Sequence, residues 1–127
     1  DAGEDNFRLG SVDVESGARL GVATDLGRPT TNMRHALSGC DFLMMEANHD
    51  ETMLRLGPYP WSVKSRIASS HGHLSNRAAA NLVAELAHPG LAGVVLAHLS
   101  EHANDPGLAE DVIAQRLDQL LAIVGRR

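Results

Sequence analysis

Residues 91–99, Leu-Ala-Gly-Val-Val-Leu-Ala-His-Leu, decide how the rest of the chain is interpreted. The run is short, apolar and rich in valine, which is typical of a strand buried in a sheet, and it carries the imidazole of His98 near its end. A second apolar run at 22–24, Val-Ala-Thr, is followed directly by the carboxylate of Asp25. Both polar residues therefore stand where a buried strand stops, which is where α/β proteins place their chemistry.

The other apolar patterns alternate between strands and helices. Further strands are expected at 7–14, 18–24 and 42–45, the first two joined by a turn at 15–17. Helices are expected after Thr30 or Thr31 up to residue 38, after Asp50 up to residue 56, and at 60–68, 75–88 and from Asp105-Pro106 onward. This alternation predicts an α/β fold in a single domain, residues 1–127, with strands buried behind helices.

The composition is that of an ordinary globular protein. Hydrophobic residues make up 43% and charged residues 21%, and no tract is long enough to cross a bilayer. The formal charge of −5 argues against a basic surface that grips nucleic acid everywhere, but it leaves room for a local phosphate site. Aromatic residues, at 3%, give little support for extended base-stacking platforms. Cys40 is the only cysteine and no export signal is visible, so we expect a cytoplasmic protein without disulfides.

Asp25 and His98 are candidate metal ligands, and each has a simpler alternative. Asp25 lies at a strand exit and is followed two positions later by Gly27, so its carboxylate can bind a cation or can cap a turn. The imidazole of His98 can bind zinc, manganese or iron, with Ser100, Glu101 or Asn104 supporting it through hydrogen bonds. Alternatively, His98 is a half-buried histidine without a ligand role.

Two further loops carry chemically useful side chains. His71 and His73 flank one glycine, so they can chelate a metal together, serve as a general acid beside the next helix, or form a solvated polar loop. Glu46 and His49 follow the strand at 42–45 and can line the same site as Asp25. In the alternative reading of that loop, residues 48 and 50, Asn and Asp, merely cap the next helix.

Five segments taken together resemble one family in their order and spacing. They are Thr24-Asp25-Leu26-Gly27, Glu46-Ala47-Asn48-His49-Asp50, Tyr59-Pro60 with Lys64 and Arg66-Ile67, Gly72-His73-Leu74-Ser75-Asn76, and Leu96-Ala97-His98-Leu99-Ser100. The chain resembles the metallo-β-lactamase-fold hydrolases, specifically the WalJ-type (YycJ-like) branch of DNA exonucleases, which is related to ribonuclease Z. The combination of segments, from about Gly21 to Asn104, is much more specific than any one of them.

The resemblance implies a four-layer αββα sandwich with two divalent metal ions, zinc or manganese, at the sheet edges. By motif, Asp25 resembles the carboxylate that bridges both metals, and His98 resembles the last histidine ligand. His73 resembles the histidine that donates a proton near the scissile phosphate, while Glu46, His49 and His71 would line the site. A bridging hydroxide would then attack the phosphorus of a DNA phosphodiester.

The chain also departs from that family. The His-x-His-x-Asp-His motif, which supplies most of the metal ligands, does not occur, and Asp1-Ala2 look like the remains of a His-Asp-Ala segment that carries another ligand. The chain is therefore expected to be the C-terminal half of the sandwich. Asp25 and His98 alone cannot hold two metals tightly, so we expect the isolated chain to bind metal weakly and to turn over little.

Candidate partners follow from the same resemblance. DNA is the expected substrate, and Lys64, Arg66 and Arg77 are candidates for contacting its backbone. Ordinary surface charge is the alternative for all three, and it explains Arg77 better. One alternative is a hydrolase of the same fold that acts on a small ester, thioester or lactone. Another is a catalytically silent module that pairs as a homo-oligomer through exposed sheet faces.

Overall fold

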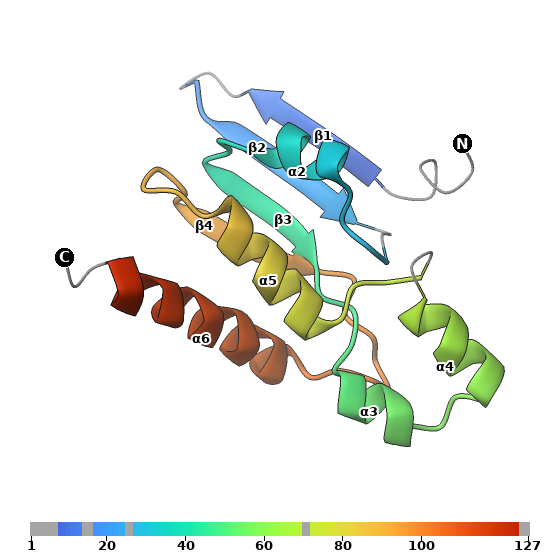
Figure 1. Ribbon diagram of the computed structural model, residues 1–127. Coiled ribbons are helices and arrows are strands. Elements are labelled where there is room, and N and C mark those ends of the chain that lie inside the picture. Colours follow the sequence, from blue (N-terminus) through green and yellow to red (C-terminus); the bar gives the residue numbers. More distant parts are fainter. Residues whose placement is uncertain (1–7, 14–16, 25–26, 70–71, 125–127) are drawn as a thin grey trace.

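A four-stranded mixed sheet forms the centre of the computed structural model, which describes residues 8–13, 17–24, 27–69 and 72–124 (Figure 1). The strands are β1 (Arg8–Asp13), β2 (Arg19–Thr24), β3 (Phe42–Glu46) and β4 (Gly93–Ala97), and they lie in that order across the sheet. β1 and β2 are antiparallel, whereas β2, β3 and β4 are parallel. The predicted α/β class and the predicted β1–β2 pairing are therefore confirmed.

Among the described residues, five helices connect and cover these strands, and their starts follow the capping signals in the sequence. They are α2 (Thr31–Leu37), α3 (Glu51–Leu56), α4 (Trp61–Ala68), α5 (Asn76–Leu86) and α6 (Pro106–Val124). The side chains of Thr30, Asp50 and Ser75 accept hydrogen bonds from the third backbone N–H beyond them, as helix caps do. None of the described helices is both long and apolar enough to span a bilayer.

The core lies between one face of the sheet and helices α2, α5 and α6 (Figure 1). Leu43 and Met45 of β3 point into it and are almost fully buried, together with Leu37 of α2 and Val83 of α5. α6 packs along α5 and adds Ile113 to the same core. Cys40 is also buried and belongs to the same core.

The opposite face of the sheet is open. The strand register places Leu20 and Val22 of β2, Phe42 and Met44 of β3, and Val95 of β4 on one face. Phe42 is 44% exposed and Val95 is 57% exposed, because the core-forming helices all pack on the other side. The prediction that helices bury the strands therefore holds for one face only.

α5 and β4 are the elements that differ most from the predicted bounds, since both are shorter than the sequence predicts. α5 ends at Leu86 rather than near residue 88, because Pro89 disfavours a helical conformation for the residue before it. His88 then leaves the helix, and its Nε2 lies 2.6 Å from the carbonyl oxygen of Cys40 while its Nδ1 accepts from the N–H of Gly90. The chain joins the sheet only at Gly93. At its other end β4 stops at Ala97, because His98 has a φ of +56°, which is outside the extended region.

Candidate active site

Glu46 is a buried carboxylate at the carboxyl end of β3, and two histidines meet it. Its side chain is fully buried, with Oε2 2.7 Å from Nδ1 of His73 and Oε1 3.3 Å from Nδ1 of His98. The three residues come from β3, from the loop before α5 and from the position directly after β4. Burial of a carboxylate costs free energy unless charged or polar groups bond to it, and here two imidazoles contact it.

The backbone at His98 turns sharply to bring its ring to this point. His98 has a φ of +56°, in the left-handed region, and is the only described residue other than glycine with a positive φ. The Nδ2 of Asn48 donates to its carbonyl oxygen at 3.0 Å, which supports that conformation. The left-handed backbone conformation costs about 1 kcal/mol or more for a residue with a Cβ. Strained backbone conformations of this kind are found most often at functional sites.

His73 is oriented from both sides. An ionised carboxylate only accepts hydrogen bonds, so Nδ1 of His73 donates to Glu46 and Nε2 is the ring nitrogen left to exchange a proton. The N–H of His73 donates to the carbonyl oxygen of Ile67 at the end of α4. Gly72 makes this approach possible, because a Cβ there would lie 2.2 Å from that same oxygen. The loop is therefore packed tightly enough to fix the imidazole.

His49 is the third imidazole of this region and lies deeper. It is 2% exposed, its Nδ1 lies 3.1 Å from Oδ1 of Asn48, and burial lowers its pKa from the ordinary value. The nearby His73 lowers the pKa further, while Glu51 and Asp50 act in the opposite direction. His49 is therefore held as a neutral imidazole near neutral pH.

Asn48 links the loops that carry the site. Its backbone N–H donates to the carbonyl oxygen of Leu74, and its own carbonyl oxygen accepts from the N–H of Ser100. Of the alternative in which Asn48 and Asp50 cap the next helix, only the Asp50 part is confirmed, because Asp50 accepts from the helical N–H of Met53. No sequence signal points to this bridging role, since it depends on three strands ending at the same edge.

A buried pair of amides lies beneath these loops. Asn76 and Asn104 are 2% and 7% exposed, and each donates its Nδ2 to the other's Oδ1, at 2.7 and 2.8 Å. Asn104 also donates to the carbonyl oxygen of Ala47, one residue after Glu46. The predicted support of His98 by Asn104 is therefore wrong, because its amide is used to join the start of α5, the start of α6 and the exit of β3.

The remaining predicted residues divide into three groups. Asp25 and His71 lie outside the described residues. Lys64 lines a cavity beside His73, whereas Arg66 is exposed on α4 and does not line it. Arg77 is exposed, and its guanidinium lies 4.0 Å from Glu51, in agreement with ordinary surface charge.

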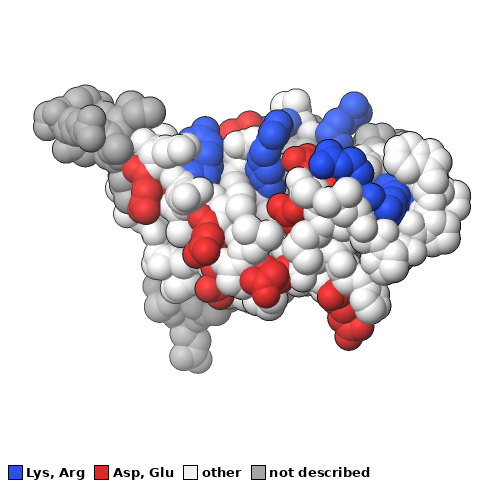
Figure 2. All heavy atoms as spheres, turned by 90° about the horizontal axis from the view of Figure 1, so that it is seen from below, with Lys and Arg blue, Asp and Glu red and all other residues white. Residues whose placement is uncertain are grey.

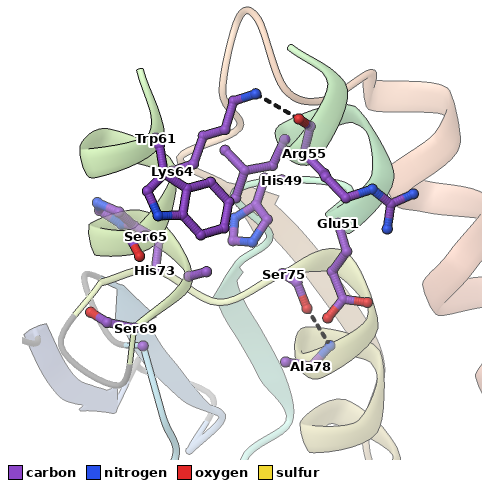
Figure 3. A pocket seen from close by; sticks show the side chains of 13 residues that line it. His49, Glu51, Arg55, Trp61, Lys64, Ser65, Ser69, His73, Ser75 and Ala78 are labelled. Carbon is purple, nitrogen blue, oxygen red and sulfur yellow. Dashed lines mark hydrogen bonds between the residues drawn. The ribbon is translucent and has the colours of Figure 1, made fainter. Parts of the chain in front are cut away.

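That cavity lies between α3, α4 and the beginning of α5, and Figure 3 shows its walls. Its volume is about 540 Å³, and both His49 and His73 line it, so it opens beside the Glu46 site. Figure 2 shows one face of the molecule, on which the visible Lys and Arg side chains lie in the upper half and most of the Asp and Glu side chains lie below them. The residues that line the cavity therefore include imidazole, cationic and aromatic side chains.

Metal binding by this chain stays a prediction. Within residues 8–13, 17–24, 27–69 and 72–124, no three His, Cys, Asp or Glu side chains lie close enough together to hold a metal ion. The chemistry of His98 nevertheless suits a ligand, because metal-binding histidines usually donate their other ring N–H to a carboxylate or carbonyl oxygen, and Nδ1 of His98 lies beside Glu46.

Comparison with known proteins finds relatives of one kind. No family model matches the chain. It is 38% identical over 101 residues to the exodeoxyribonuclease YycJ of Bacillus anthracis, and 35% identical over 98 residues to the exodeoxyribonuclease WalJ of Streptococcus pneumoniae. The matches cover 80% and 77% of this chain but only 38% and 36% of the relatives, so the chain spans little more than a third of their length. Over this stretch the chain is related to the YycJ and WalJ exodeoxyribonucleases, which confirms the predicted resemblance to the WalJ-type branch.

Proposed function

We propose that the intact protein containing this chain is a metal-dependent phosphodiesterase that degrades DNA. The names of the YycJ and WalJ relatives support this activity. The observation that carries the proposal is the buried Glu46 carboxylate held between His73 and His98 where the parallel strands end. That arrangement provides an oriented proton donor beside a histidine suited to bind metal.

The proposal includes the four-layer αββα sandwich, of which this chain would supply the C-terminal half. The open face of the sheet supports it, because Phe42, Met44 and Val95 offer an apolar surface of the kind that packs against a second sheet. The missing His-x-His-x-Asp-His ligands would lie in that other half. The relatives are long enough to contain it, since the chain matches only 38% of YycJ.

Asp25 and His98 are the residues of this chain that we propose as ligands of two divalent ions, zinc or manganese. When bound, the ions would supply an activated water and positive charge at the phosphate. Thr24, the last residue of β2, is buried and precedes Asp25 directly, so the ligand would follow a rigid strand. Glu46 would hold the His98 ring through Nδ1 and leave Nε2 as the ligand atom.

His73 would deliver the proton that the leaving oxygen needs. Its Nδ1 is engaged by Glu46, so Nε2 is the nitrogen that would carry the proton. Glu46 would keep the ring in the correct tautomer and stabilise its charged form, acting as a positioning residue. General acid catalysis of this kind contributes about 10²- to 10⁴-fold to rate.

The test compares substrates and variants in the full-length protein. The wild type should release nucleotides from a single-stranded DNA oligonucleotide and leave a small thioester or lactone intact. His98→Ala should lose bound metal and activity together, whereas His73→Ala should lose activity at unchanged metal content, as measured by elemental analysis. Preferential cleavage of the thioester would replace the nuclease with a small-ester hydrolase, and loss of metal from His73→Ala would make that residue a ligand.

A further inference from the structure

The cavity beside His73 has one wall that the proposed chemistry does not use. Trp61, Lys64, Ser65 and Ala68 line it from α4, and their spacing places them on one face of that helix. None of the α4 side chains is fully buried. The helix therefore contributes little to the core, and its cavity face needs another explanation.

Trp61 is the most informative residue of that face. It is the only tryptophan in the chain, and it remains 75% exposed although it lines the cavity. Leu56, on α3, is equally exposed at 74% but does not line the cavity. Leaving an indole in water forfeits more apolar burial than any other side chain, so a Trp at the mouth of a cavity indicates a surface that a ligand covers.

Two cations accompany the indole. Lys64 is half-buried, and its Nζ donates to the carbonyl oxygen of Arg55 at 2.5 Å, which fixes the ammonium at the cavity wall (Figure 3). The Arg55 side chain also lines the cavity. One carboxylate, Glu51, lines it too, and Arg77 lies 4.0 Å from that group. Lys64 and Arg55 thus add two cationic residues to a cavity lined by an exposed aromatic ring, which suits an anionic ligand that has an aromatic part.

We infer that Trp61 stacks on an unpaired nucleobase of the DNA strand, while Lys64 and Arg55 contact its phosphates. The inference rests on the proposed nuclease function and adds a subsite to it. The cavity joins this wall to His73, so a strand lying on α4 would be presented to the reactive histidine. Stacking requires a base that is free of its complement, and a single indole serves one base with little sequence preference.

The test uses the full-length protein, short single-stranded oligonucleotides and three variants. Trp61→Ala should raise the KM for DNA by about 5- to 100-fold, the range for losing one base-aromatic stack. Trp61→Phe should keep most of the affinity, and Leu56→Ala, which removes an equally exposed apolar side chain outside the cavity, should match the wild type. The effect should fall on KM rather than kcat.

Abasic substitution identifies the stacked base. Oligonucleotides with one abasic residue, moved through successive positions, are measured for binding in EDTA by fluorescence anisotropy. With the abasic residue at one position, the wild type should lose affinity for the oligonucleotide and bind it no more tightly than Trp61→Ala does. An equal penalty for Trp61→Ala at every position, or none at all, overturns the inference. So does a Trp61→Ala variant that binds DNA normally but loses self-association in size-exclusion chromatography, since Trp61 would then be a protein contact. Failure of the wild type to cleave DNA instead overturns the proposed function.

Discussion

The buried amide pair Asn76–Asn104 is the structural element whose removal has the most calculable effect. Asn104→Ala removes both reciprocal amide bonds, the bond to the Ala47 carbonyl oxygen and the bond from the N–H of Asp105. It leaves the Asn76 amide and that carbonyl without these partners in a buried place. Each buried polar group left unsatisfied costs about 1–3 kcal/mol, and neighbouring losses are less than additive, so we expect a loss of about 3–5 kcal/mol.

A double-variant cycle separates the pair from its surroundings. Asn76→Ala removes only the two reciprocal bonds, because Asn104 still donates to the Ala47 carbonyl oxygen and accepts from the N–H of Asp105. It should lower the free energy of unfolding by about 2 kcal/mol. The double variant should cost about 1–2 kcal/mol less than the sum of the single ones. Urea denaturation followed by circular dichroism gives these free energies of unfolding.

Asn81→Ala is the matched control. It removes an asparagine side chain from α5, the helix that begins with Asn76, but Asn81 is exposed and is bonded to Arg116 on the surface. Its free energy of unfolding should stay within about 0.5 kcal/mol of the wild type. An Asn104→Ala loss below about 1 kcal/mol, or one equal to that of Asn81→Ala, would refute the reasoning that this pair holds the site loops to α5 and α6.

Three further predictions follow from other parts of the structure. Gly72→Ala should destabilise the protein by about 1–3 kcal/mol and reduce DNA cleavage, because its Cβ would lie 2.2 Å from the Ile67 carbonyl oxygen. Gly93→Ala, whose Cβ would make an ordinary contact at 3.4 Å, should change neither the free energy of unfolding nor DNA cleavage. Because the pKa of His49 is lowered by burial, its unfolded form binds protons more readily, so stability should be complete above about pH 6.5 and fall as the pH drops below it. The His49→Gln variant should show a smaller decline in the free energy of unfolding between pH 7 and 5, and an unchanged decline would contradict the assignment. The isolated chain should self-associate through its open sheet face, and Val95→Asp should shift it toward monomer in analytical ultracentrifugation; a wild-type chain that is monomeric at all concentrations would show that this face needs no cover.

The sequence predicts the elements well because the signals that start and stop them are local. Thr30, Asp50 and Ser75 cap helices through bonds to residues three positions away, so their roles can be recognised without knowledge of the fold. The ends of α5 and β4 were placed less accurately. The end of α5 and the start of β4 flank His88, whose ring contacts the carbonyl oxygen of Cys40, 48 positions away in sequence.

The candidate site divides in the same way. The order of motifs placed Glu46, His73 and His98 in one site through resemblance, but the contacts of Glu46 with both imidazoles arise only when three strand ends meet. The position of Asn48 permits the alternative role of helix cap, whereas its actual partners lie on two distant loops. The exposure of Trp61 was equally invisible, since a tryptophan in an amphipathic helix normally packs into the core.

The central claim is that His73, held by Glu46, gives a proton to the leaving oxygen of a DNA phosphodiester. The most direct measurement is kcat for wild type and His73→Ala on two substrates, a DNA oligonucleotide and a p-nitrophenyl ester of a nucleotide, whose phenolate leaves without a proton. We expect His73→Ala to lose about 10²-fold or more in kcat on DNA and to keep nearly wild-type turnover of the p-nitrophenyl ester. Equal losses on both substrates, or full activity on DNA, would contradict it.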